Sequence, residues 1–343
     1  MALVIESLNN ALRTALEKDK HVIILGEDIL DPYGGAFRVT QGLSSAKPDQ
    51  ILTTPVSEAG IVGVAIGMAL RGFRPVIEIM FGDFITLAAD QLINHATKFR
   101  FMYNDQVDVP IVIRTPMGGR RGYGPTHSQT MEKLFMGIPN LFILAPNIFN
   151  DPGQLLLNSI FSVDEPVLFV ENKIQYTQDL VGEHELKDFK ITQTYRPDNE
   201  LDAPICDFAL PIHLSFRDAP NPKVTIATYG YMADLCRQAA LRLAYEDEII
   251  TDIIIFSQLL PLDVSSMYQS LENSNRLLVV EEGTITSGWG AEVIASCLEK
   301  FGNFNLQARR VASKDSPIPA SSSLEQSHLP SVEDIILAVK KMV

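Results

Sequence analysis

Residues 54–91 read TPVSEAGIVGVAIGMALRGFRPVIEIMFGDFITLAADQ, and this stretch decides how the rest of the chain is interpreted. The run from Ala59 to Leu70 is apolar and of helical length, and Ser57 stands in front of it as an N-cap. Glu58 then falls in the first helical turn, where a carboxylate complements the helix dipole. On this pattern alone Glu58 has two interpretations: a residue that stabilises the helix start, or an acid placed for chemistry.

Two glycines inside the same predicted helix call for a packing explanation. Gly63 and Gly67 lie one turn apart, although each glycine lowers helix propensity by about 1 kcal/mol. Since glycine lets another backbone approach closely, we expect a second segment or subunit to pack there.

Strands and helices alternate along the first half of the chain. Short apolar runs separated by helix-length segments are typical of a mostly parallel sheet in an α/β fold. Ligand sites in such sheets lie at the carboxyl ends of the strands. The expected strands are VIILGED from Val22, PVIEIM from Pro75, VPIVIRTPM from Val109, LFILAPN from Leu141 and PVLFVE from Pro166.

Periodicity fails between Val181 and Pro222, where five prolines occur, and we expect a linker there. Beyond it, VTIATYG, DIIIFSQ, RLLVVEE and LQARRVAS alternate with helical segments, which predicts a second, smaller α/β domain. The expected organisation is a first domain over residues 1–185, a linker over 186–222 and a second domain over 223–343. A final helix is expected after Ser331, with Asp334 three residues on as its capping partner.

Bulk composition narrows the classes of partner. The chain has 343 residues, of which 46% are hydrophobic, enough for two buried cores. Its 28 basic and 42 acidic residues give a net charge of −14, which argues against nucleic acid or an anionic membrane as a partner. Three widely spaced cysteines form neither a disulfide framework nor a metal motif, and the first residues resemble no targeting segment. We therefore expect a cytoplasmic protein with no membrane span.

A second centre of chemistry is the loop MGGRRGYGPTHSQ, from Met117 to Gln129. Its four glycines and one proline give it a defined shape, but it lacks the flanking elements of a phosphate-binding P-loop. His127 stands near its end. A lone histidine is usually structural, so its role depends on context.

That context is a family resemblance. The spacing Glu58-x4-Gly63-Val64-x2-Gly67 followed by Phe84-x3-Ala88-x2-Gln91 resembles the pyrimidine-binding domain of thiamine-diphosphate enzymes of the transketolase-like superfamily. Within it, the chain looks most like the beta subunit of the first, decarboxylating component of 2-oxo-acid dehydrogenases. GEDILDPYGGAFRVTQGL, GPTHSQ, TIATYG, LLPLD, GWGAEV and SPIP match in the same order, and the similarity weakens only between about Gly182 and Pro222.

The resemblance implies roles for particular residues. Glu58 would share a proton with the aminopyrimidine ring of thiamine diphosphate, and burial would raise the pKa of such a carboxyl. Phe84 would stack on that ring and hold it flat, and Phe81 is the alternative candidate for this role. His127 would be the second catalytic residue, orienting substrate and moving protons. By the same match, the remaining cofactor-lining residues are Glu27, Val56, Ser57 and Met80.

One expected motif is missing. The family holds the cofactor diphosphate and magnesium with Gly-Asp-Gly followed by paired asparagines, and this chain has only Gly82-Asp83, so we expect no metal ligands here. The resemblance thus implies half of a site, completed by an alpha subunit that holds magnesium in a two-by-two heterotetramer. The acyl product would pass to a lipoyl-bearing acyltransferase, and the isolated chain would form a homodimer.

Three alternatives remain open. Half of a split transketolase-like ketol transferase would carry a similar GPTH motif but act on sugar phosphates. A non-catalytic assembly subunit would lack Glu58 or His127, and both are present. An ordinary nucleotide-binding protein is disfavoured because no GxGxxG fingerprint follows the first strand. The sequence does not name the 2-oxo acid, pyruvate or branched-chain.

Overall fold

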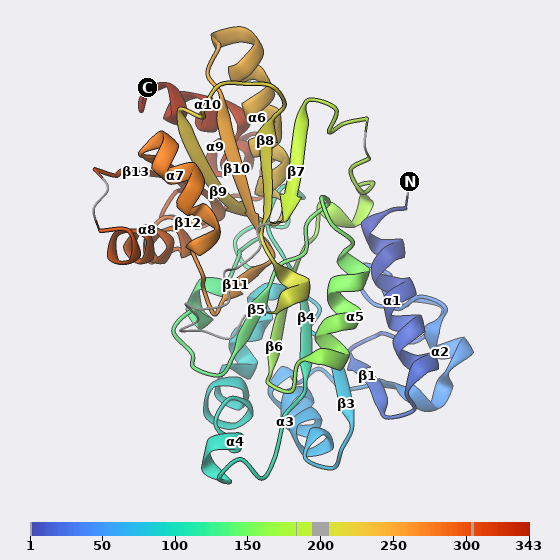
Figure 1. The fold of residues 1–343 in the computed structure, drawn as a ribbon. Helices are drawn as coiled ribbons and strands as arrows, with labels where there is room; N and C mark the ends of the chain where they lie inside the picture. The colour runs from blue at the N-terminus through green and yellow to red at the C-terminus, as the bar shows by residue number, and fades with distance from the viewer. Residues whose placement is uncertain (1, 183, 194–205, 303–304) are drawn as a thin grey trace.

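A computed structural model describes residues 2–182, 184–193, 206–302 and 305–343 as two α/β domains (Figure 1). The first domain contains a seven-stranded sheet with the order β11-β5-β6-β4-β3-β1-β2. All neighbours in it are parallel except the pair of β11 with β5. Its strands are β1 Val22–Gly26, β2 Ile51–Thr53, β3 Arg74–Glu78, β4 Val112–Met117, β5 Phe142–Leu144, β6 Val167–Asn172 and β11 Gln258–Leu260.

Helices cover both faces of this sheet because its buried strands carry apolar side chains on alternating sides. Ile24 faces the cluster formed with α1 (Val4–Lys18) and α5 (Pro152–Ser162). Leu25 faces the opposite cluster, which includes α3 (Glu58–Ala69). The shorter elements of the domain are α2 Leu43–Ala46, the 3₁₀ helix η2 Gly82–Ala88, the π-helix η3 Gln91–Ala96 and α4 Phe99–Met102.

The second domain contains a six-stranded sheet with the order β13-β12-β9-β10-β8-β7. Its strands are β7 Phe189–Gln193, β8 Ile212–Phe216, β9 Val224–Tyr229, β10 Thr251–Phe256, β12 Arg276–Thr284 and β13 Gln307–Ser313. Its helices are α6 Met232–Asp247, α7 Tyr268–Ser274, α8 Trp289–Lys300, α9 Ser322–His328 and α10 Val332–Lys340. As the sequence predicts, Ser331 caps α10, with its Oγ accepting from the Asp334 N–H at 3.1 Å.

The interpretation of residues 186–222 as a linker is wrong for the parts of it that the structure describes. β7 and β8 form an antiparallel hairpin there, and β8 also pairs antiparallel with β10. The described prolines of this stretch, Pro211, Pro220 and Pro222, lie outside both strands, so they do not interrupt the ladder. Residues 194–205 of the expected linker lie outside the described residues.

The two domains share one apolar core. β11 comes from the second half of the chain but pairs with β5 of the first sheet, with Gln258 opposite Leu144. Phe256 and Trp289 belong to the same buried cluster as Ile143. Because this core is continuous, the ends of strands β4 and β12 hold fixed positions relative to each other. Within the described residues, no helix is both long and apolar enough to cross a bilayer.

Candidate active site

Glu58 begins α3, as the sequence predicts. The Ser57 Oγ accepts a hydrogen bond from the Gly60 N–H at 3.3 Å, and this cap fixes where the helix starts. The Glu58 side chain is only 6% exposed, yet within the described part of the chain no donor bonds its carboxylate. A carboxylate that no protein group bonds is open to a ligand that brings the donor.

Glu27 lies beside Glu58, immediately after the carboxyl end of β1. Burial raises the pKa of the Glu27 carboxyl, the negative charge of Glu58 raises it further, and the Ser57 N–H opposes both effects. Glu27 Oε1 is buried and has no partner among the described residues. The structure therefore brings together two carboxylates that are 31 residues apart in the sequence.

An aromatic cluster stands next to these acids. The ring centroids of Phe81 and Phe84, 5.9 Å apart, lie 4.8 and 5.2 Å from that of His127, and both phenylalanines meet the imidazole edge to face. The ring centroid of Tyr123 lies 5.9 Å from that of Phe81, also edge to face. Phe84 belongs to η2, and this short helix packs against α3. Such rings bind another flat ring by stacking or edge contact.

The other expected lining residues occupy less enclosed places. Met80 is half-buried between β3 and η2, while Ser57 is exposed and its hydroxyl caps α3. Val56 is 80% exposed. Within this chain Val56 therefore borders an open surface, and a wall over it has to come from another molecule.

Hydrogen bonds hold His127 within its loop. Thr126 Oγ1 lies 2.9 Å from His127 Nδ1, and Lys173 Nζ donates to the His127 carbonyl oxygen at 2.7 Å. Gln129 Nε2 donates to Asp83 Oδ1 at 2.7 Å, which ties the end of the loop to η2. The imidazole is half-buried, so it remains accessible to a substrate.

Lys173 is a site residue that the sequence reasoning missed. It follows β6, and its side chain is fully buried with Nζ 5.3 Å from the centroid of the Phe81 ring. Burial lowers the pKa of Lys173 to about 8, and the negative charges of Asp83 and Glu282 oppose this shift. Its place after the carboxyl end of a parallel strand was the available signal.

A buried charge network lies in the strands beneath the site. Arg114 donates to both oxygens of Glu171, at 2.7 and 2.8 Å, and to Glu78 at 2.8 Å. Tyr176 donates to Glu171 as well. The two carboxylates hold the pKa of Arg114 above its usual range despite its burial. This network fixes β3, β4 and β6, from whose ends the site residues project.

The thiamine diphosphate implied by the resemblance fits these residues only in part. A buried carboxylate without a donor, an aromatic wall and the unpartnered Gln91 Oε1 suit an aminopyrimidine ring. In residues 2–182, 184–193, 206–302 and 305–343, no group of three or more His, Cys, Asp or Glu side chains is placed to hold a metal ion.

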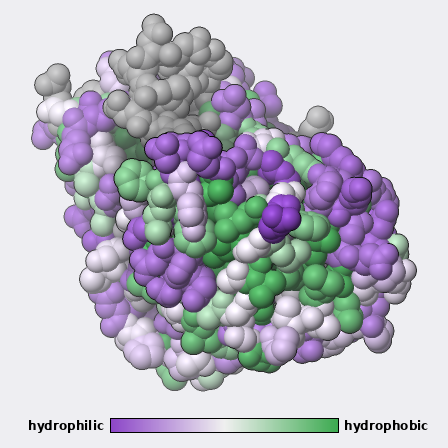
Figure 2. Space-filling model, turned by 90° about the horizontal axis from the view of Figure 1, so that it is seen from below, coloured by the Kyte–Doolittle hydropathy of each residue, from purple (hydrophilic) through white to green (hydrophobic). Residues whose placement is uncertain are grey.

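Apolar surface gathers on the face seen from below (Figure 2), at the end of the molecule where α3 and α4 lie (Figure 1). Val64 on α3 is 58% exposed, and Phe101 on α4 is 82% exposed. A Cβ built on Gly67 meets no atom within 4 Å, so no described segment packs against it. At Gly63 the nearest atom is Gln91 Cγ, at 3.9 Å, so the close backbone approach expected at these two glycines does not occur within the described residues.

Comparisons with known proteins agree with this architecture. Two family models match: transketolase, pyrimidine binding domain, over residues 3–178, and transketolase, C-terminal domain, over residues 216–335. Pyruvate dehydrogenase E1 component subunit beta-1, mitochondrial, of Arabidopsis thaliana is 34% identical over 338 residues, 98% of this chain and 88% of that protein. The E1 component subunit beta of Rickettsia conorii is 33% identical over 339 residues, covering 98% and 97%.

This chain is also similar to one further relative and to one solved structure. Acetoin:2,6-dichlorophenolindophenol oxidoreductase subunit beta of Cupriavidus necator is 33% identical over 345 residues, covering 98% of this chain and 95% of that protein. A solved structure described as a split gene transketolase, inactive beta4 tetramer, has a TM-score of 0.72 at 17% identity, covering 99% of this chain and 97% of that one. At that identity the structural match shows the fold alone.

Proposed function

Because this chain belongs to the family of pyruvate dehydrogenase E1 component beta subunits, with transketolase pyrimidine-binding and C-terminal domains, we propose that it acts on a 2-oxo acid. In this proposal it serves in a thiamine-diphosphate-dependent 2-oxo-acid dehydrogenase that passes the acyl group to a lipoyl protein. The observation that carries the proposal is Glu58, a buried carboxylate without a donor, beside Glu27 at the start of a capped helix.

Thiamine diphosphate, when bound, supplies a nucleophilic thiazolium carbon and an acceptor for the electron pair released on decarboxylation. Glu58, beside Glu27, would share a proton with the pyrimidine ring of the bound cofactor. Phe81 and Phe84 orient a flat ring against the imidazole of His127. His127 binds the substrate and moves a proton at a ring nitrogen.

The proposal of a partner subunit rests on exposed apolar surfaces of this chain. The exposed Val56, the uncovered α3 glycines and the apolar surface around α4 suit cover by other subunits. We propose an alpha subunit that holds magnesium and the diphosphate, in a two-by-two heterotetramer. A shared cofactor at that interface explains why the described residues present the pyrimidine half alone. A cytoplasmic location stays a prediction.

Turnover by the chain reconstituted with its alpha subunit tests the proposal. Pyruvate, a branched-chain 2-oxo acid, acetoin and a sugar phosphate are offered in turn, with a lipoyl domain as acceptor. We expect carbon dioxide release and acyl transfer with a 2-oxo acid. Acetoin is included because a relative with 33% identity is named for acetoin oxidation. Turnover of acetoin alone, or of the sugar phosphate alone, would overturn the assignment.

A further inference from the structure

A carboxylate of the second domain binds the backbone of the His127 loop. Glu325 Oε1 accepts from the Arg120 N–H at 2.8 Å, and Oε2 accepts from the Gly122 N–H at 3.0 Å. Glu325 lies on α9, 205 residues from Arg120, and is only 2% exposed. Both of its oxygens thus accept from backbone N–H groups, and Lys173 interacts with its charge at longer range.

A second carboxylate holds the start of the same loop. Glu282 on β12 accepts from the Gly119 N–H at 2.7 Å and from Asn172 Nδ2 at 3.2 Å. A Cβ on Gly118 would stand 2.9 Å from Glu282 Oε1, and one on Gly119 would stand 2.6 Å from Leu329 Cδ1. The glycines of the loop are therefore needed for this close approach.

The loop backbone is also held in an unfavourable conformation. Arg120 has φ +71°, in the left-handed region that non-glycine residues rarely adopt. Such a residue persists where surrounding contacts over-determine it. Arg120 Nη2 donates to the Pro330 carbonyl oxygen at 2.6 Å, so its side chain and its N–H both bind the segment that contains α9.

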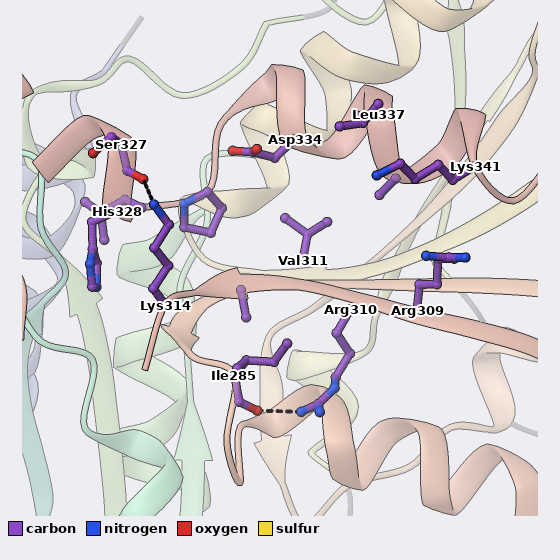
Figure 3. Close-up of a pocket in the computed structure, with 14 residues that line it drawn as sticks. Ile285, Arg309, Arg310, Val311, Lys314, Ser327, His328, Asp334, Leu337 and Lys341 are labelled. Carbon is purple, nitrogen blue, oxygen red and sulfur yellow. Dashed lines mark hydrogen bonds between the residues drawn. The ribbon is translucent and has the colours of Figure 1, made fainter. Parts of the chain in front are cut away.

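Lys314, which follows β13, also holds the α9 segment in place. Lys314 Nζ donates to the Ser327 carbonyl oxygen at 2.7 Å, a bond drawn in Figure 3. Residues 327–330 form one wall of an open cavity of about 510 Å³ that is also lined by β13 and α10. None of the proposed catalytic or cofactor-binding residues lines this cavity, so α9 separates it from the His127 loop.

We infer that Glu325 is a positioning residue that sets the conformation of the His127 loop from the second domain, with Glu282 as its neighbour in the same clamp. The part of this inference that concerns catalysis rests on the proposed function, because that proposal gives His127 its role in the reaction. The contacts of Glu325 with the loop do not depend on it. Glu325 touches the loop backbone and acts on the reaction through His127. Loss of both acceptor oxygens leaves two N–H groups unpaired and frees the Arg120 backbone to relax.

Hydrogen exchange and proteolysis of the full chain test the clamp without any cofactor. In Glu325→Ala, amides of residues 118–130 are expected to exchange about tenfold faster, the effect of losing roughly 1.4 kcal/mol of local stability. Trypsin should cleave faster after Arg120 and Arg121, while peptides from β1 and β9 keep their protection. Glu325→Gln keeps one acceptor oxygen and should give an intermediate result. Gln326→Ala, an exposed change on the same helix, is the matched control.

Unchanged loop protection in Glu325→Ala overturns the inference, and so does an equal rise in exchange throughout both domains. Should the alanine variant not fold, loop protection in Glu325→Gln decides the matter in the same way. In the reconstituted enzyme, Glu325→Gln should lower kcat about tenfold or more with thiazolium proton exchange unchanged. If the wild-type enzyme consumes no 2-oxo acid, the proposed function fails while the exchange result still decides the clamp.

Discussion

Lys173 donates a hydrogen bond from its buried Nζ to the backbone carbonyl oxygen of His127, over 2.7 Å. This bond supports the histidine from below, at the end of the loop opposite the contacts of Glu325. The histidine is therefore held through its backbone and, at Nδ1, by Thr126 Oγ1 at 2.9 Å, while no hydrogen bond within the described residues occupies Nε2.

Replacing this lysine should affect chemistry more than folding. Lys173→Met retains a side chain of similar length and removes the donor to the His127 carbonyl oxygen, so the melting temperature should fall only slightly. Acyl transfer in the reconstituted enzyme should slow by about tenfold, because the His127 backbone loses its donor. Lys20→Met, a change at an exposed lysine, is the control. A variant that transfers acyl groups at the wild-type rate would show that the bond has no functional role.

His127 is expected to act after the cofactor has been activated. His127→Ala should leave thiazolium proton exchange largely intact and reduce acyl transfer to a lipoyl acceptor by roughly 10²- to 10⁴-fold. Nuclear magnetic resonance measures the first rate, and a lipoyl-domain assay measures the second. Equal loss of both rates would contradict this division of roles, provided that the variant keeps its melting temperature.

Glu58 is expected to act in the activation itself. Glu58→Gln keeps the shape of the side chain and removes the titratable proton. Thiazolium proton exchange in the reconstituted enzyme should then slow by orders of magnitude. Glu17→Gln, on the exposed face of α1, serves as control. Exchange in Glu58→Gln at the wild-type rate would refute the assignment.

A buried carboxyl in the second domain gives stability a particular dependence on pH. Burial raises the pKa of Glu281 from 4.5 to about 7, the nearby charge of Glu132 adds to the rise, and the Gly290 N–H opposes it. Between these two values the folded state binds more protons than the unfolded state. The stabilisation is thus complete below about pH 4.5 and is lost as the pH rises through about 7, by up to about 3 kcal/mol.

Glu281→Gln removes this titration because the amide stays neutral. Urea unfolding at several pH values from 5 to 8 should show the variant gaining stability relative to wild type as the pH rises. Glu292→Gln, at an exposed position on α8, should show no such trend. A stability difference between Glu281→Gln and wild type that does not change with pH would contradict the raised pKa.

Much of the fold could be predicted because local patterns decide it. The apolar strands of the first sheet and the N-cap at Ser57 are encoded within a few residues of where they act. The hairpin of β7 and β8 was missed because its stability comes from pairing with β10, far along the chain. The exchange of β11 into the first sheet has the same origin.

The site residues likewise fall into those that the sequence predicts and those that it does not. Glu58 and His127 stand in motifs with recognisable spacing, and the structure places Glu27 and Phe84 around them. Glu325 carries no local signal, because its partners are backbone N–H groups more than 200 residues away. Any carboxylate on α9 looks like an ordinary surface charge until the domains are assembled.

Calorimetric titration of thiamine diphosphate with magnesium tests the half-site directly. The isolated chain should bind the cofactor weakly or not at all, because no group of three or more His, Cys, Asp or Glu side chains among its described residues is placed to hold the magnesium ion that the diphosphate needs. Adding the alpha subunit should produce one tight site per beta chain, and the melting temperature of the assembly should then rise with cofactor concentration. Tight, stoichiometric binding by the isolated chain would contradict the account and indicate a self-contained enzyme.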